Sequence, residues 1–246
     1  GYRFLTPNSG ANYTFAGNSL TIGPDPIGDI EDGLYWGGSS SSTMTINNLI
    51  VNNARIDNRG SGTFTLAGNM TATNSVVVNA MNAPINISAN LSGNGSMAYV
   101  GNQGNQNGLN TAYQGNKVTL SGNNSGFAGQ TVIGFGAGAA GGLTIDSEAR
   151  LGANPASFTY NQLDLNRGQL TTTATMTLSS ANRGILLDVN GGDFDPAAGT
   201  TLTINCQLSS PSLPGGGVTA GNLNKTSPGT LVLNSPNSGF NGMLYV

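Results

Sequence analysis

Oxygen-bearing side chains with spacing suited to a cation lie in one short segment of this chain. Asp188, Asn190, Asp193 and Asp195 belong to the stretch L-D-V-N-G-G-D-F-D. Calcium is bound by carboxylate and amide oxygens at flexible spacing, so these four residues are candidate calcium ligands. The segment occurs once, however, and Asn and Asp residues at a corner between two strands explain it more simply.

A second acidic group, Asp25, Asp29, Glu31 and Asp32, lies in a Pro/Gly-rich stretch. It could bind calcium in the same way, although a solvated loop is the simpler interpretation. The chain has no histidine, and it contains no G-x-S-x-G motif, no phosphate-binding loop and no metal-ligand spacing. Catalysis would therefore depend on the few carboxylates and basic residues. We predict that the protein is not an enzyme and that it uses no cofactor.

Tyr35 and Trp36 form the one aromatic pair that sits in a flexible polar stretch, D-G-L-Y-W-G-G-S-S-S-S. Exposed aromatic rings stack on sugars or on partner proteins, which makes this pair the candidate contact site. The alternative is that one of the two rings closes the hydrophobic core. The sequence alone leaves both interpretations open.

The composition favours extended structure with uncharged polar surfaces. Of 246 residues, 8 are Lys or Arg, 11 are Asp or Glu and 38 are Gly. Only 8% of the residues are charged, whereas about a quarter is usual. The net charge of −3 and the scarcity of basic residues argue against nucleic acid or an acidic membrane surface as a partner. The apolar runs are too short for a transmembrane segment.

Short strands must position these residues, because helical signals are nearly absent. No segment keeps an apolar period of three to four residues, whereas apolar residues alternate with Thr and Asn along most of the chain. Cys206, the single cysteine, shares the phase of Ile204 and Leu208, which predicts a buried thiol rather than a reactive one. Representative alternating pairs are Met44/Ile46, Phe64/Leu66, Val118/Leu120, Leu163/Leu165, Ile185/Leu187 and Leu202/Ile204.

Two stretches of the chain repeat one another. Val118–Val132 aligns with Leu231–Val246, so that N-S-G-F at 124–127 falls on N-S-G-F at 237–240. Apolar pairs also recur at intervals of about 20–24 residues, the length of one coil of a parallel β-helix. About 22 residues per coil predicts roughly eleven coils and a rod on the order of 50 Å long. A β-sandwich, the alternative fold, does not require such an interval. The recurring positions are Leu143, Leu163, Ile185, Leu208 and Leu231, and separately Leu202, Leu223 and Leu244.

We therefore predict a single all-β domain, a parallel β-helix over residues 1–246. Inward stacks of aliphatic residues would form its core, and outward stacks of Thr, Ser and Asn would bond along the coils without charge. Residues 1–24 are less regular, and the Gln/Asn/Gly-rich segment Gly101–Gly115 is expected to project from one coil as a polar loop. Val246 falls within an alternating pattern, so we expect the chain to be a fragment of a longer one.

The second half of the chain resembles the autotransporter-associated β-strand repeat of large secreted bacterial surface proteins. The resemblance covers 117–246 well and 47–120 more loosely, and Ser227 and Ser235 stand where the repeat has glycine. It implies a right-handed, single-stranded parallel β-helix that serves as a passenger on or outside a Gram-negative cell, and it transfers no catalytic residue. The matching residues are Gly221, Leu223, Lys225, Gly229, Thr230, Leu231, Leu233, Asn237, Gly239, Phe240, Gly242 and Val246.

These observations predict a non-catalytic structural or adhesive stalk, located outside the cell or on its outer surface. Its expected partners are surface glycans or host and matrix proteins. The alternative is a self-assembling extracellular filament or matrix subunit, because an uncapped coil end is a strand edge that pairs with another chain. A polysaccharide-acting enzyme is the least favoured class, since it requires clustered carboxylates and basic residues along one face.

Overall fold

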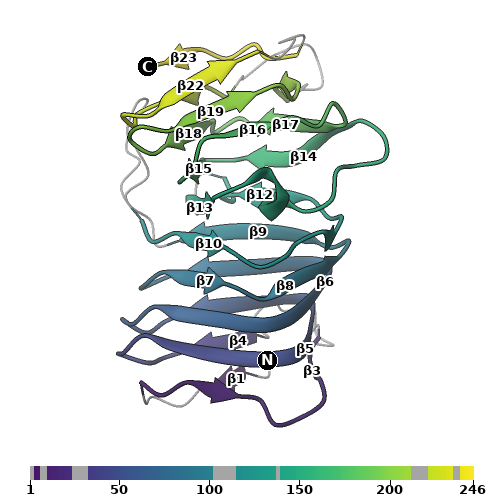
Figure 1. Ribbon diagram of the computed structural model, residues 1–246, viewed down its shortest axis with the longest axis vertical. Coiled ribbons are helices and arrows are strands. Elements are labelled where there is room, and N and C mark those ends of the chain that lie inside the picture. Colours follow the sequence, from purple (N-terminus) through teal and green to yellow (C-terminus); the bar gives the residue numbers. More distant parts are fainter. Residues whose placement is uncertain are drawn as a thin grey trace.

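The computed structural model shows an elongated β-solenoid of about eight turns, with the N-terminal strands at one end and the C-terminal strands at the other (Figure 1). The strands of successive coils pair in parallel, which confirms the predicted parallel β-helix. Apart from one 3-10 turn, η1 (Glu148–Leu151), the described residues contain no helix, and none that could cross a membrane. The structure describes residues 3–5, 10–23, 33–101, 115–136, 139–211, 221–234 and 239–246.

Each coil bends at corners that divide it into faces, here called A, B and C in chain order. In β5 (Ser42–Asn58) and β6 (Phe64–Ala80) the pairing register shifts between Ile46 and Leu49 and again between Asn52 and Ala54, which marks the two corners. Face A then stacks β2 (Tyr13–Thr14), the starts of β5 and β6, β7 (Ile85–Ile87), β10 (Val118–Leu120), β13 (Gly141–Ile145), β15 (Gly168–Thr172), β18 (Gly192–Pro196), β21 (Leu223–Asn224) and β23 (Leu244–Tyr245).

The other two faces follow from the same strand pairings. Face B stacks β3 (Leu20–Ile22), the middle of β5 and β6, β8 (Asn90–Gly93) and β11 (Gly126–Phe127); beyond η1 it is a separate sheet of β16 (Met176–Leu178), β19 (Thr201–Ile204) and β22 (Thr230–Leu233). Face C stacks β1 (Arg3–Leu5), β4 (Gly33–Trp36), the ends of β5 and β6, β9 (Ser96–Gly101), β12 (Thr131–Ile133), β14 (Thr159–Leu165), β17 (Arg183–Leu187) and β20 (Leu208–Ser209).

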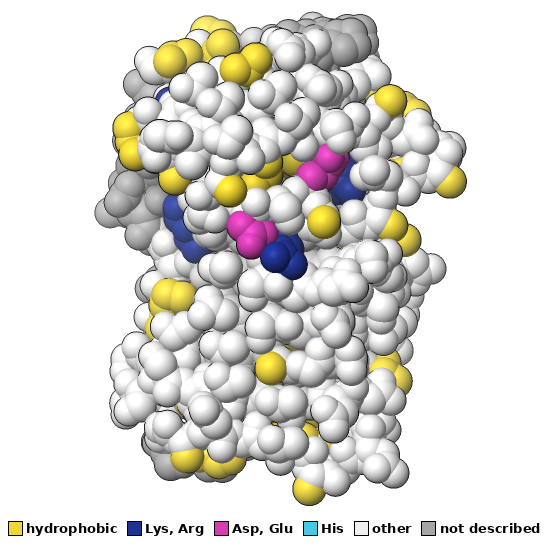
Figure 2. All heavy atoms as spheres, viewed as in Figure 1, with side chains coloured by type: hydrophobic (Ala, Val, Ile, Leu, Met, Phe, Trp, Pro, Cys, Tyr) yellow, Lys and Arg dark blue, Asp and Glu magenta, His cyan; other side chains and the backbone are white. Residues whose placement is uncertain are grey.

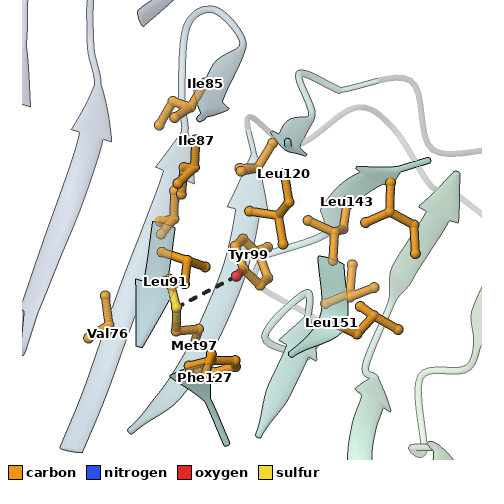
Figure 3. Close-up of a cluster of buried hydrophobic side chains, with 14 of the residues drawn as sticks. Val76, Ile85, Ile87, Leu91, Met97, Tyr99, Leu120, Phe127, Leu143 and Leu151 are labelled. Atoms are coloured by element: carbon orange, nitrogen blue, oxygen red, sulfur yellow. Dashed lines mark hydrogen bonds between the residues drawn. The ribbon is translucent and has the colours of Figure 1, made fainter. Parts of the chain in front are cut away.

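Alternation along each strand builds one continuous core inside the coils. On face A, Val118 pairs with Leu143 and Leu143 with Leu170, and all three are fully buried. Because parallel in-register pairing places like side chains above one another, each apolar residue is covered by the coil before and after it. Figure 3 shows how side chains from several strands converge in this core. They include Val76, Ile85, Ile87, Leu91, Met97, Tyr99, Leu120, Phe127, Leu143 and Leu151.

Asparagine side chains bond along the outside of the coils, as the composition predicts. The Asn69 side-chain amide donates to the Asn47 carbonyl oxygen at 2.9 Å, and the Asn90 amide donates to Asn69 Oδ1 at 3.0 Å. Asn90 Oδ1 in turn accepts from the Asn123 backbone N–H at 3.0 Å. These bonds connect successive coils without any formal charge.

The predicted number of coils, roughly eleven, is wrong, because the coils differ in length. Ladder neighbours from β5 to β8 are 21 or 22 residues apart, as in the Asn90–Asn69 and Asn69–Asn47 bonds. In the preceding coil the Thr43–Asn12 bond joins residues that are 31 apart. Later neighbours are up to 33 or 34 residues apart, as in the Gln162–Gly129 and Ser96–Gln130 bonds. About eight coils at about 4.8 Å each give a rod on the order of 40 Å long.

The predicted apolar series is correct on face C and wrong at its ends. Leu163 pairs with Ile185 and Ile185 with Leu208, as the interval predicts. Leu143, however, lies on face A beside Val118 and Leu170, and Leu231 lies on face B beside Leu202. Each of the three faces carries similar Leu-x-Leu pairs. A constant sequence interval can therefore connect pairs that lie on different faces, and the sequence alone does not show this difference.

The two N-S-G-F repeats occupy different faces of the solenoid. Gly126 pairs with Ser92 on face B, whereas Gly239 bridges to Ser209 on face C. Their surroundings are nevertheless alike: a Cβ added at Gly126 would lie 3.2 Å from the Ser92 Cβ, and one at Gly239 would lie 3.3 Å from the Ser209 Cβ. The same sequence unit therefore fits more than one phase of the coil.

Some predicted segments lie wholly or partly outside the described residues. Residues 1–24 contain the short strands β1, β2 and β3. Of the predicted projecting loop Gly101–Gly115, only the first and last residues are described. The acidic group Asp25, Asp29, Glu31 and Asp32 lies outside the described residues.

Candidate functional site

The charged side chains are few and lie beside groups of opposite sign. Figure 2 shows one face on which they gather around the middle of the long axis, while most of the surface is uncharged. Asp57, fully buried, bonds to Arg55 at 2.9 Å and to Arg59 at 3.1 Å. Asp146 bonds to Arg150 at 2.7 Å, and this bond lowers the pKa of the carboxyl. Charge is thus largely neutralised within the described part of the chain.

The structure does not bring the four candidate calcium ligands together. Asp193 and Asp195 flank the inward-pointing Phe194 in β18, on face A, whereas Asp188 and Asn190 follow β17 at the end of face C. Asp195 Oδ2 accepts from the Thr171 hydroxyl at 3.1 Å and lies 3.5 Å from Lys117 Nζ. Among the described residues no group of three or more acidic, His or Cys side chains could hold a metal ion.

Asp188 and Asn190 instead join a polar ladder with Asp164 and Asn166, here called the Asp/Asn ladder. The Asn166 amide donates to Asp188 Oδ2 at 2.7 Å, and the Asn190 amide donates to Asn166 Oδ1 at 2.7 Å. Asp164 lies in β14 between the buried Leu163 and Leu165 and therefore points outward from face C, and Asn166 is the first residue after this strand.

Sequence reasoning missed Asp164 and Asn166, although a signal was present. L-D-L-N at 163–166 returns as L-D-V-N at 187–190. In the structure the two copies are offset by two positions: Leu165 pairs with Leu187, and Asp164 pairs with Leu186. This offset places Asp188 beside an asparagine rather than beside Asp164. Two carboxylates directly opposite one another would repel, so the offset lowers the cost of placing both acids on one face.

Asp164 is the acid with the most altered environment in the ladder. Its neighbours in the adjacent coils are Val132 and Leu186, and its Oδ1 is buried without a hydrogen-bond partner among the described residues. Burial, and secondly the charge of Asp188, raise the pKa of this carboxyl to about 7. Asp164 can therefore gain or lose a proton near neutral pH, and in its protonated form it is a hydrogen-bond donor.

We expect Asp164 to make the stability of the protein depend on pH between about 4 and 7. The unfolded carboxyl has a pKa of about 3.9, so in this window the folded state binds the proton more tightly. The free energy of unfolding should thus be highest near pH 4–5, fall as the pH rises, and level off above the folded pKa. We expect a loss of about 1–3 kcal/mol between pH 5 and pH 8, measured by urea unfolding.

The chain suits this measurement because it has no histidine to titrate in the same range. Asp164→Asn should abolish the decline and make the protein more stable than wild type at pH 8. Asp146→Asn is the matched control, since the pKa of Asp146 is lowered rather than raised, and it should leave the decline in place. An Asp164→Asn variant with an unchanged pH profile would contradict the assignment.

Tyr35 and Trp36 are both buried, whereas their candidate contact role requires exposed rings. Tyr35 is 2% exposed and Trp36 is 0% exposed. The Arg59 guanidinium covers the Tyr35 ring at 4.4 Å from its centroid, and the Trp36 ring stacks on Phe64 at 5.4 Å between centroids. Polar neighbours in the sequence suggested a loop, but β4 places the two residues in the stack of face C.

Cys206 is fully buried, which confirms the predicted inert position of the thiol. Burial, and secondly the charge of Glu148, raise the pKa of this thiol to about 11. A thiol that stays protonated at neutral pH is a poor nucleophile and a poor metal ligand. Cys206 therefore acts as a small apolar core residue.

One buried arginine side chain bonds to the loop that follows η1. The Arg183 side chain, 0% exposed, donates to the carbonyl oxygens of Leu151 and Gly152 at 3.1 Å each and to Asn154 Oδ1 at 3.2 Å. Its Nε lies 3.8 Å from Glu148 Oε1. Arg183 thus holds the chain that follows η1, and no feature of the sequence distinguishes it from the other arginines.

Comparisons with known proteins found no matching family model, no matching curated protein and no matching solved structure.

Proposed function

We propose that this chain is a non-catalytic stalk of a secreted or cell-surface bacterial protein, with a structural or adhesive role. The observation that supports it best is the continuous stack of parallel coils, whose described charges are largely paired with one another. In such a stack each coil contacts only its neighbours, so stiffness and stability grow with the number of coils. A rod of this kind separates what is attached at its two ends.

The sequence resemblance supports the same proposal. The autotransporter-associated repeat belongs to proteins exported from Gram-negative cells, which favours an extracellular or outer-surface location. The asparagine ladders on the outside of the coils connect them without formal charge. The expected partners of an adhesive stalk are surface glycans or matrix proteins.

A deletion of one whole coil tests the stalk. Phe64 and Ile85 are ladder neighbours, so deleting residues 64–84 places Ile85 where Phe64 was and keeps every face in phase. We expect this variant to fold, with a β-type circular dichroism spectrum and a length shorter by about 5 Å in small-angle scattering. The matched control deletes residues 64–74, about half a coil, and should fail to fold because the face C part of β6 then directly follows the face C part of β5 and takes the place of face A.

Location is tested on the cells that produce the protein. Antibodies against the chain should bind to intact cells or to the material that the cells secrete. Labelling only after permeabilisation would overturn the extracellular proposal. A one-coil deletion that loses the β-type spectrum would overturn the modular stalk.

One observation favours the filament as a second candidate. In the coil that contains β22 and β23, Leu231, Leu233 and Phe240 are only partly buried, and Leu244 is 49% exposed. A further coil, from a longer chain or from a second copy, would bury these side chains. Sedimentation of the protein over a range of concentrations decides between the two candidates. Fibres or oligomers that grow with concentration support the filament, and a monomer at all concentrations opposes it.

A further inference from the structure

Two aromatic side chains are exposed side by side where the chain enters β14. Phe158 is 46% exposed and Tyr160 is 56% exposed, whereas Thr159 between them is partly buried and pairs with Arg183. In an extended chain alternate residues point to the same side and lie about 7 Å apart. The two rings therefore face the solvent together, on the outside of the solenoid.

The strand pairing is irregular beside these two residues. Thr159 pairs with Arg183 and Leu163 with Ile185, so the residues from Tyr160 to Gln162 oppose Gly184 alone. A Cβ at Gly184 would lie 2.5 Å from the Tyr160 Cα and carbonyl oxygen, so only glycine lets the two backbones approach this closely. Bulges of this kind redirect side chains and are frequent beside functional sites.

The loop that leads to the two rings is held rigidly. Arg183 binds its first carbonyl oxygens, as described above, and the Asn182 amide donates to the Pro155 carbonyl oxygen at 2.9 Å. The Asn182 carbonyl oxygen accepts from the Thr159 N–H at 2.9 Å. Aromatic rings on a fixed backbone lose little conformational entropy when a partner binds, which is the property of contact residues in binding sites.

Among the described residues, the polar groups next to the two rings in sequence or through hydrogen bonds are uncharged. Ser157, Thr159, Asn161, Asn182 and Ser209 neighbour them in sequence or through hydrogen bonds, and they offer only hydroxyl and amide groups. The nearest described cation, Arg183, is fully buried and directed inward. A protein interface would instead be expected to combine a wider apolar centre with exposed arginine. Aromatic faces with neutral hydrogen-bonding groups match the C–H faces and hydroxyls of a neutral sugar.

We propose that Phe158 and Tyr160 form a contact site for a neutral glycan chain. The inference rests on the proposed adhesive stalk and gives it a site and a class of partner. The two rings stack on successive sugar units, the Tyr160 hydroxyl and the neighbouring amides bond to sugar hydroxyls, and the fixed backbone holds the rings in this geometry. The site takes over the contact role that the sequence suggested for Tyr35 and Trp36.

The test uses the whole chain against immobilised and soluble oligosaccharides. The probes are neutral glucan, mannan, galactan and chitin oligomers, with uronic acid oligomers as charged counterparts. We expect binding to at least one neutral class of oligosaccharide. The double variant Phe158→Ala/Tyr160→Ala should lower the affinity by about 100-fold, and each single variant should lower it by about tenfold. Phe135→Ala is the matched control, because Phe135 is also exposed, at 63%, and lies in a different part of the chain, after β12. It should bind within about twofold of wild type.

Folding of each variant is checked by its unfolding transition, which exposed substitutions should leave nearly unchanged. Absence of binding to every neutral probe, binding to uronic acids alone, or a double variant with wild-type affinity would each overturn the proposal. These outcomes differ from failure of the stalk itself. If the protein lies on the cell surface and tolerates the one-coil deletion but binds no glycan, the stalk proposal stands and only the glycan site is contradicted.

Discussion

Replacing Arg183 with methionine should lower the free energy of unfolding by about 3–5 kcal/mol, the usual cost of removing one member of a buried charged network. The guanidinium is fully buried and donates to Leu151, Gly152 and Asn154, so the variant leaves these acceptors without their donor. Methionine keeps much of the volume but none of the hydrogen bonds. Urea unfolding followed by the fluorescence of the single tryptophan measures the loss.

Arg150→Met is the matched control for this substitution. Arg150 pairs with Asp146 four residues away and donates to the Gly122 carbonyl oxygen at 2.6 Å, and both charged side chains are partly exposed. Exposed ion pairs contribute little, so we expect a loss of about 1 kcal/mol or less. Equal losses in the two variants would contradict a special role of Arg183. The Arg183 variant should also loosen the loop before Phe158, which amide hydrogen exchange in residues 152–158 would report.

Replacing Trp36 with alanine should cost about 3–5 kcal/mol, because the large ring is 0% exposed and stacks on Phe64. The indole Nε1 has no hydrogen-bond partner among the described residues, so Trp36→Phe should cost much less, about 1–2 kcal/mol. The alanine variant removes the fluorescent reporter, and its unfolding is therefore followed by circular dichroism.

The Trp36 pair of variants also separates a core role from a contact role. A core residue loses stability in proportion to the volume removed and leaves glycan binding at Phe158 and Tyr160 unchanged in the folded protein. If Trp36→Ala proved as stable as wild type and instead altered binding, the ring would act as a contact residue and its burial here would be irrelevant to its function.

The sequence by itself predicted the architecture of this protein and part of its register. Alternation of apolar residues requires strands with one buried side, and a recurring interval of about 22 residues requires that the strands stack as coils. Leu163, Ile185 and Leu208 stack as predicted, and Cys206 is buried as its phase indicated. These features are local or periodic, so they can be recognised without knowing which residues meet in space.

Only the tertiary structure decided which residues gather at a site. The exposure of Tyr35 and Trp36 depended on whether β4 joins the stack, which their polar sequence neighbours did not indicate. The pairing of Asp188 with Asn166 depends on a register offset of two residues. Likewise, the exposure of Phe158 and Tyr160 is evident only from the structure. Insertions and offsets between coils change the partners of a residue without changing its own local pattern, and for this reason the sequence alone could not specify them.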